Sequence, residues 1–228
     1  MQEKPSFSIV IPAWNSESQL KQNLPAVFAA SELVDAQIIV VDDRSLLDNT
    51  ASYLKSLGSR ITLLKNKSNL GFAATVNDGV SVATGDIVIL LNTDVRPSAD
   101  CFTHLAESFR DADLFAVTFN ADSTWARGVW ERGLFHHFRQ EPKSPNQLSL
   151  SASIFASGGQ AAFSRHKWMQ LGGMDPIYAP FYWEDVDLGY RAWKRGWRII
   201  FDPRAHVFHD HEISVIKHNF SQQHVQSI

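Results

Sequence analysis

The sequence has one cysteine, no long apolar run and no surplus of positive charge among its 228 residues. The lone Cys101 cannot form an internal disulfide, which fits a reducing compartment. No apolar stretch reaches the ~18 residues that a membrane-spanning helix requires, and no signal peptide precedes the first predicted strand. With 21 basic and 24 acidic residues, the formal net charge is −3, which argues against nucleic acid as a partner. We therefore expect a cytoplasmic protein, with peripheral attachment to the inner face of the cell membrane as an alternative.

The sequence also lacks the glycine motifs that bind phosphates. Residues 7–12 form the first predicted strand, which Pro12-Ala13-Trp14-Asn15 closes. A dinucleotide-binding fingerprint would need closely spaced glycines here, and a P-loop occurs nowhere in the chain. A sugar-1-phosphate nucleotidyltransferase would need a glycine-rich, basic loop at the same place, so this function is disfavoured.

Strand and helix patterns alternate through the first half of the chain. Hydrophobic residues make up 44% of the sequence, which suffices for one domain with a core. Apolar runs at residues 38–41, 61–64, 87–91 and 114–119 are predicted strands, with helical spacing between the earlier ones. This alternation predicts an α/β fold with a mostly parallel, Rossmann-like sheet and helices on both faces. We assign residues 1–228 to one domain, with a nucleotide-binding half at about 5–120 and an acceptor half at about 121–215.

The second half has weaker patterns. Residues 123–145 mix aromatic, arginine and histidine residues without a clear period, and we interpret them as an irregular insertion. It either shapes the acceptor side or is a solvated loop packed by its own aromatics. Helices are predicted at about 98–110 and 184–195, a strand-like segment with a glycine pair at 154–163, and strands at 197–201 and 205–209.

The most buried predicted strand ends in a polar triplet. Five apolar residues, 87–91, run without interruption into Asn92-Thr93-Asp94. A run of this kind is typical of a strand covered on both faces, and open α/β sheets bind ligands at the carboxyl ends of such strands. Asn92 and Asp94 therefore either line a cleft, where a carboxylate suits a divalent cation on a phosphate, or simply begin a turn.

Further acidic residues lie where they can reach the same edge. Asp42-Asp43 follows the second strand and either caps a turn or binds a nucleobase and ribose, with Trp14 as a stacking surface. Glu184, Asp185 and Asp187 begin a predicted helix. They either complement the helix dipole or include a general base, for which Asp185 beside Trp183 is our candidate. His209, on the last predicted strand, is either a structural histidine or a metal ligand.

The order of these motifs resembles the family 2 glycosyltransferases of the GT-A fold. The matching pieces are residues 8–15, 40–45, 69–72 with Asn77, 85–94, the pairs Gly158-Gly159 and Gly172-Gly173, residues 184–188, and His209 before Ser214. Residues 69–72 and 91–94 look like those of bacterial rhamnosyltransferases and galactofuranosyltransferases of cell-surface glycans.

The resemblance implies a role for each matching residue. Asp94 and His209 would hold Mg²⁺ or Mn²⁺, and Asp185 would be the catalytic base. Residues expected to bind the donor nucleotide are Pro12, Trp14, Asn15, Asp42, Asp43, Asn69, Gly71, Asn77, Asn92 and Thr93. Residues expected on the acceptor and sugar side are Gly158, Gly159, Trp183, Glu184 and Asp187.

Two departures from the family pattern qualify these roles. Asn92 stands where the family's metal motif has its first acid, so metal binding depends more heavily on Asp94. The chain also continues only briefly after His209, as in a compact member or an excised domain.

The sequence thus predicts an inverting glycosyltransferase. The donor would be a dTDP- or UDP-sugar and the acceptor a hydroxyl of a glycan or lipid-linked molecule in cell-surface polysaccharide synthesis. The alternative is a non-catalytic nucleotide-sugar binder or scaffold.

Overall fold

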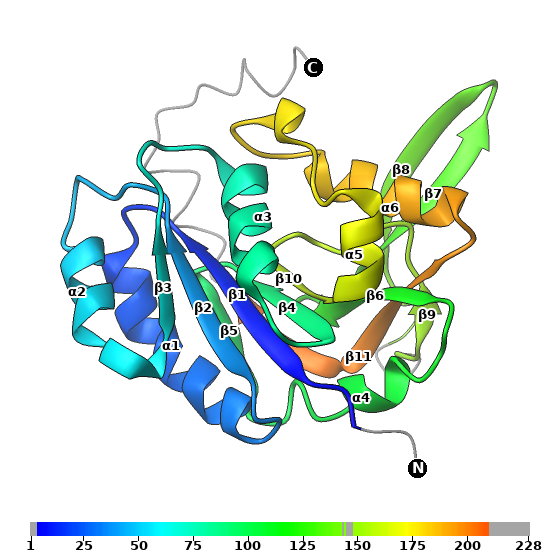
Figure 1. Ribbon diagram of the computed structural model, residues 1–228. Helices are drawn as coiled ribbons and strands as arrows, with labels where there is room; N and C mark the ends of the chain where they lie inside the picture. The colour runs from blue at the N-terminus through cyan, green and yellow to red at the C-terminus, as the bar shows by residue number, and fades with distance from the viewer. Residues whose placement is uncertain (1–3, 143, 145–147, 210–228) are drawn as a thin grey trace.

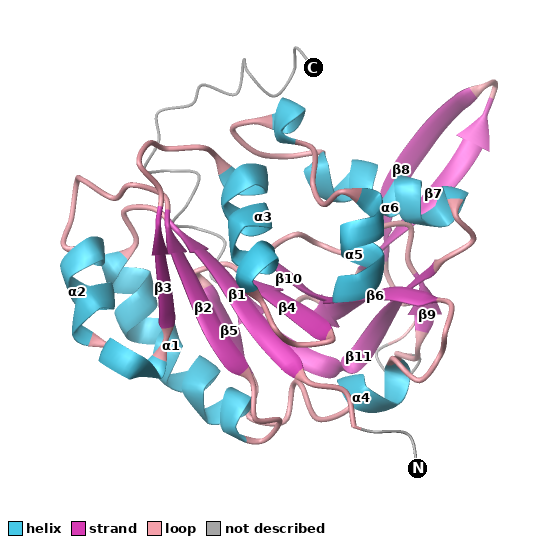
Figure 2. Ribbon diagram, in the orientation of Figure 1, coloured by secondary structure: helices cyan, strands magenta, loops and turns pink. Residues whose placement is uncertain are grey.

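A computed structural model describes residues 4–142, 144 and 148–209 of the chain (Figure 1). Ser214 and the end of the predicted acceptor half lie outside these residues. Within them, one large curled sheet carries helices on both faces (Figure 2). The predicted α/β architecture is confirmed.

The first half of the chain forms the parallel part of the sheet. Its strands follow the order β3-β2-β1-β4, and each neighbouring pair is parallel. All four predicted strands are present, and β4 is buried along its whole length. The elements are β1 (Phe7–Ala13), α1 (Glu17–Glu32), β2 (Gln37–Asp42), α2 (Thr50–Ser56), the 3₁₀ turn η1 (Gly58–Arg60), β3 (Thr62–Lys65), α3 (Phe72–Val82) and β4 (Ile87–Leu91).

The second half continues the sheet in mixed orientation. The order runs on from β4 to β10, β6, β11 and β5, and β9 pairs with β11. Strand β10 is antiparallel to both of its neighbours, whereas β6 and β11 are parallel. The elements are β5 (Val95–Pro97), α4 (Leu105–Ser108), β6 (Leu114–Asn120), β7 (Trp125–Glu131), β8 (Leu134–Gln140), β9 (Ser151–Ala152), β10 (Gln160–Ser164), α5 (Arg165–Leu171), the 3₁₀ turn η3 (Pro176–Tyr178), α6 (Glu184–Lys194) and β11 (Arg198–His209).

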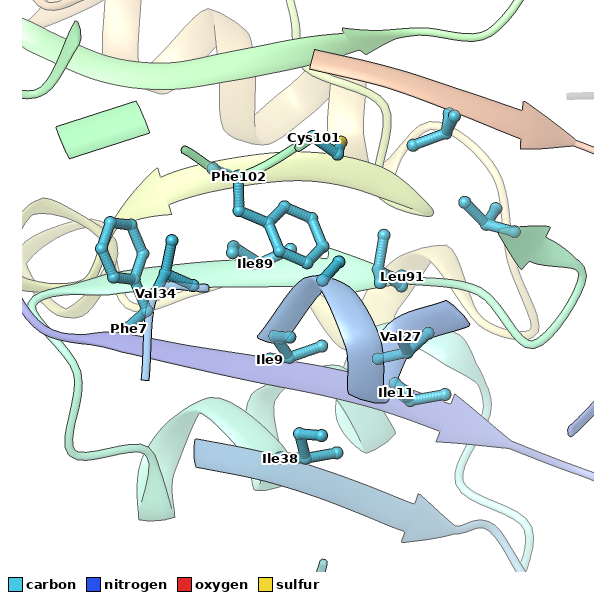
Figure 3. Close-up of a cluster of buried hydrophobic side chains, with 14 of the residues drawn as sticks. Phe7, Ile9, Ile11, Val27, Val34, Ile38, Ile89, Leu91, Cys101 and Phe102 are labelled. Carbon is cyan, nitrogen blue, oxygen red and sulfur yellow. The ribbon is translucent and has the colours of Figure 1, made fainter. Parts of the chain in front are cut away.

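Two apolar layers hold the helices against the sheet. On one face, side chains of β1 and β4 such as Ile9 and Leu91 pack against Val27 of α1 and against Phe102 (Figure 3). On the other face, Val10 and Leu90 pack against α3, α5 and α6, with Trp168 fully buried among them. Alternate residues of one strand therefore enter opposite layers, as expected for a strand covered on both faces.

Three predictions for the second half are wrong. Described residues in 123–145 form mainly the two-stranded hairpin β7–β8, not an irregular insertion. Its two-residue turn, Arg132-Gly133, has positive φ at both positions (51° and 83°), as the tight turns of hairpins require. The helix expected to reach Arg110 is reduced to α4, four residues long. The two strands expected at the end are one twelve-residue strand, β11, whose register shifts between Asp202 and His206.

Candidate active site

The carboxyl ends of the parallel strands meet at one edge of the sheet. Asp42 lies opposite both Ala13 of β1 and Lys65 of β3, and the Asp43 N–H donates to the Ala13 carbonyl at 2.8 Å. The parallel order of the strands therefore brings several predicted donor-binding residues to this edge, namely Pro12, Trp14, Asn15, Asp42, Asp43, Asn69 and Gly71.

A pocket of about 350 Å³ opens at this edge. Trp14 is partly exposed there, and Leu46 and Leu47 are strongly exposed. The lining combines three apolar side chains with polar ones, which suits a planar base bound by stacking and by edge contacts. Its residues are Trp14, Asn15, Arg44, Leu46, Leu47, Ser68 and Asn69. Sequence reasoning missed the two leucines, because exposed leucines in a loop carry no periodic signal.

Asn15 and Asp42 shape the loop that carries those leucines. Asn15 has a left-handed backbone (φ 47°), and its Oδ1 accepts from the N–H groups of Leu46 and Leu47, both at 2.9 Å. Oδ1 of Asp42 accepts from the Ser45 N–H at 2.9 Å. Both side chains therefore fix the wall of the pocket, and their predicted contact with a nucleotide stays a prediction.

Asp43 is held within the protein. Its side chain is only 4% exposed and accepts from Asn66 Nδ2 at 2.9 Å and from the Gly71 N–H at 3.0 Å. The Leu70 N–H donates to both of its oxygens, at 2.9 and 3.1 Å. The carboxylate thus anchors the turn before α3. Gly71 (φ 81°) fits there because a Cβ would lie 3.1 Å from the Pro180 carbonyl oxygen.

Asn77, another predicted donor-binding residue, is committed elsewhere. Its Nδ2 donates to the Met174 carbonyl at 2.7 Å, and its Oδ1 accepts from the Met174 N–H at 3.0 Å. Both ends of the amide therefore join α3 to the turn after α5. These contacts give Asn77 a structural role whether or not a nucleotide is bound.

Asp94 and His209 meet, as predicted. Asp94 directly precedes β5, and His209 pairs with Val95 at the end of β11. His209 Nε2 lies 3.4 Å from Asp94 Oδ1, and both side chains are largely buried. A carboxylate oxygen beside an imidazole nitrogen fits a divalent cation that takes its other ligands from a diphosphate. The described residues contain no group of three or more candidate ligands, so these two would be its main protein ligands.

Asn92 and Thr93 are tied to their surroundings through the backbone. The Asn92 N–H donates to the Gly159 carbonyl at 2.8 Å, and the Thr93 carbonyl accepts from Asn23 Nδ2 at 2.9 Å. A Cβ on Gly159 would lie 2.3 Å from the Asn92 amide nitrogen, so glycine is required for this close approach.

The three acids of α6 lie in three different environments. Asp185 Oδ1 accepts from the Val186 N–H at 2.8 Å, and its Oδ2 accepts from the Gly158 N–H at 3.3 Å. Burial raises the pKa of Asp185, and these backbone donors oppose the rise. Glu184 is 5% exposed, and burial, with the nearby Asp185 charge, raises its pKa to about 7. Asp187 instead forms an ion pair with Arg191 at 2.7 Å.

Gly158 and Gly159 connect the two groups of predicted catalytic residues. Gly158 donates to Asp185, and the next residue accepts from Asn92, two positions before Asp94. This segment thus links the base candidate to Asn92, on the stretch of chain that leads to Asp94. The arrangement can present a hydroxyl to a carboxylate beside a cation-bound diphosphate.

Curated proteins are similar to this chain along most of its length. Over 231 aligned positions, the chain is 24% identical to the inactive polypeptide N-acetylgalactosaminyltransferase-like protein 5 of Mus musculus. The alignment covers 89% of this chain and 52% of that protein. This chain spans a third to about half of the length of the first curated relatives that it matches.

Solved structures share the fold. One is GalNAc-T7 with UDP, GalNAc and Mn²⁺, with a TM-score of 0.74 and 19% identity, over 92% of this chain and 44% of that one. Another is the mannosyltransferase PcManGT of Pyrobaculum calidifontis with GDP-Man and Mn²⁺, with a TM-score of 0.69 and 19% identity, over 91% and 57%. The model of the family described as "Glycosyl transferase family 2" matches residues 8–172. That match covers most of the chain, which therefore belongs to glycosyl transferase family 2.

Proposed function

We propose that this domain transfers a sugar, with inversion, from a UDP- or dTDP-sugar to a hydroxyl of a glycan or lipid-linked acceptor. The observation that carries the proposal is the segment Gly158-Gly159, which ties Asp185 on one side and Asn92 on the other. The related structures named above contain UDP or GDP-Man with Mn²⁺, which supports a nucleotide sugar as donor. A role in bacterial cell-surface polysaccharide synthesis, and a place on the cytoplasmic side of the membrane, belong to the same proposal.

Donor binding and proton transfer are assigned to different residues in this proposal. The base of the donor lies in the pocket beside Trp14, and the diphosphate extends toward Asp94. Asp185 accepts the proton of the acceptor hydroxyl while its oxygen attacks the anomeric carbon from the face opposite the diphosphate. The bond to the diphosphate breaks as the new glycosidic bond forms, so a single displacement inverts the configuration.

Asp94 and His209 would hold the cation. A bound divalent ion would supply positive charge to the departing diphosphate. Mg²⁺ takes oxygen ligands almost exclusively, whereas one of the two donors here is a nitrogen, which favours Mn²⁺.

The test separates chemistry from binding. Asp185→Asn should abolish transfer, while the thermal stabilisation by UDP- or dTDP-sugar with Mn²⁺ should stay as in the wild type. The matched control is Asp113→Asn, at an exposed aspartate before β6. NMR of the product gives the anomeric configuration. Near wild-type turnover in Asp185→Asn, or a retained configuration, would refute the proposed mechanism.

A second candidate is a nucleotide-sugar binder without turnover. It is favoured by Asn92 at an acidic position of the motif and by the inactive relative described above. This candidate would be supported if the protein binds a nucleotide sugar but, with Mn²⁺ present, neither hydrolyses it nor transfers the sugar to any acceptor.

A further inference from the structure

The hairpin β7–β8 brings one histidine against Trp183, two positions before the predicted base, and places the neighbouring histidine on the opposite face. His137 pairs with Gly128 and His136 with Val129, so consecutive histidines point to opposite faces. The His137 ring meets the Trp183 ring edge-on, with centroids 5.1 Å apart, and the Phe155 ring likewise at 5.7 Å.

The face that carries His137 is fastened to the rest of the domain. The Ala126 carbonyl, at the base of β7, accepts from the Ile154 N–H at 3.0 Å. Farther along the hairpin, the ring of Phe135 lies 6.3 Å from that of Tyr190 on α6. A Cβ on Gly128 would lie 2.8 Å from the Phe135 ring, so glycine allows this close packing. The hairpin projects from the domain beside α6 (Figures 1 and 2). His137 lies on the face of the hairpin that contacts Trp183 and Phe155.

The partner of His137 defines where α6 begins. Tyr182 and Trp183 both have left-handed backbones (φ 79° and 74°), which residues with large side chains rarely adopt outside functional sites. Trp183 immediately precedes Glu184 and Asp185, and its side chain is 44% exposed. A contact that holds the Trp183 ring therefore restrains the residue that leads into the base.

His137 also acts on Asp185 electrostatically. Two charged groups of the described residues are coupled to Asp185: Glu184, whose pKa the Asp185 charge raises, and His137 on β8, which lowers the pKa of Asp185. Glu184 and Asp185 disfavour each other's negative charge, whereas a protonated imidazole favours the Asp185 carboxylate.

We propose that His137 is a positioning residue of the acceptor side, which holds Trp183 in place and stabilises the ionised form of Asp185. The inference depends on the proposed function only through the role of Asp185 as the base.

Three variants separate the ring contact from the charge. His137→Phe keeps an aromatic ring against Trp183 and Phe155 but removes the charge, whereas His137→Gln removes both. His136→Gln is the matched control, on the outer face of the same strand.

The first measurement does not require activity. The ¹³C signal of the Asp185 carboxyl, identified by its absence in Asp185→Asn, is followed by NMR as the pH is raised. The titration midpoint should move to higher pH in both His137 variants and stay unchanged in His136→Gln. An Asp185 midpoint that is the same in wild type and His137→Phe would overturn the electrostatic part of the inference.

The second measurement is steady-state transfer. His137→Gln should lower kcat/KM for the acceptor about tenfold without changing the KM for the donor, and His137→Phe should recover part of the loss. Equal kinetics in His137→Gln and His136→Gln would overturn the positioning role. If the NMR midpoint differs between the wild type and the His137 variants but the wild type transfers no sugar, the proposed function is refuted and the influence of His137 on Asp185 stands.

Discussion

Glu184 should make the stability of the domain fall as the pH rises. The residue is 5% exposed, and burial, with the adjacent Asp185 charge, raises the pKa of its carboxyl from 4.5 to about 7. Below pH 4.5 the carboxyl is protonated in both the folded and the unfolded chain, so its contribution to stability is fully present. Above that pH the unfolded chain releases the proton first, and the contribution is lost as the pH passes through about 7. The rise in pKa corresponds to roughly 3 kcal/mol.

Glu184→Gln removes this titration while keeping the size of the side chain. The free energy of unfolding is measured by urea denaturation at pH 5, 6, 7 and 8, and at pH 5 less than about 1 kcal/mol of the pH-dependent difference between variant and wild type should have developed. Toward neutrality, the free energy of unfolding of the variant should rise relative to that of the wild type by about 1 kcal/mol per pH unit. The difference should level off near 3 kcal/mol above pH 7.

A control variant and a second substitution sharpen this test. Glu131→Gln, at the exposed end of β7, should show no pH-dependent difference from the wild type. Asp185→Asn removes the neighbouring charge, so it should reduce the pH dependence that Glu184 causes. A difference between Glu184→Gln and wild type that stays constant from pH 5 to 8 would refute the assignment of a raised pKa to Glu184.

Three further predictions follow from single contacts. Asn77→Ala should cost about 2 kcal/mol in urea denaturation, because it leaves the buried Met174 N–H unpaired, and should change nucleotide affinity little; a large loss of affinity at unchanged stability would place Asn77 in the donor site. Phe102→Ala should lower the free energy of unfolding by about 3–5 kcal/mol, because it leaves a cavity in the apolar layer that packs α1 against β1 and β4. A smaller loss would mean that neighbouring side chains fill the cavity. Asp94→Asn should abolish the Mn²⁺-dependent part of the thermal stabilisation by a UDP-sugar, as His209→Ala should in part; unchanged stabilisation in both would remove the metal site.

The sequence predicts the parallel half of the sheet because those strands are buried on both faces. Residues 87–91 are apolar without interruption, and all five are buried in the structure. The carboxyl ends of such strands share an edge, so the meeting of Asp42 with the ends of β1 and β3 follows from topology alone.

The hairpin could not be predicted in the same way. Most residues of β7 and β8 are exposed, so no alternation of buried and exposed residues marks the strands. The one local signal is the turn at Arg132-Gly133, since glycine readily adopts a positive φ. The continuity of β11 was missed for another reason: Pro203 lies inside the strand, at the point where its register shifts.

Contacts between distant residues limit what sequence motifs say about the site. Asn77 and Met174 are 97 positions apart, and nothing near Asn77 in the sequence indicates that its amide is used by the backbone there. Asp43 is similar, because its carboxylate holds the Leu70-Gly71 turn in a position where a base contact was predicted. A polar residue at the edge of a sheet can therefore build the site without touching the ligand.

The start of α6 shows how one cluster of acids can serve different purposes. All three lie in the first turn, where the helix dipole favours negative charge, yet their burial and their partners differ. Arg191 neutralises Asp187, and two backbone N–H groups stabilise a charge on Asp185. Glu184 Oε2 is buried without a hydrogen-bond partner among the described residues, and burial, with the adjacent Asp185 charge, raises the pKa of this carboxyl to about 7. The same first turn therefore holds one ion-paired acid, one acid that accepts from backbone N–H groups, and one whose pKa lies near 7, so the helix dipole alone does not set their charges.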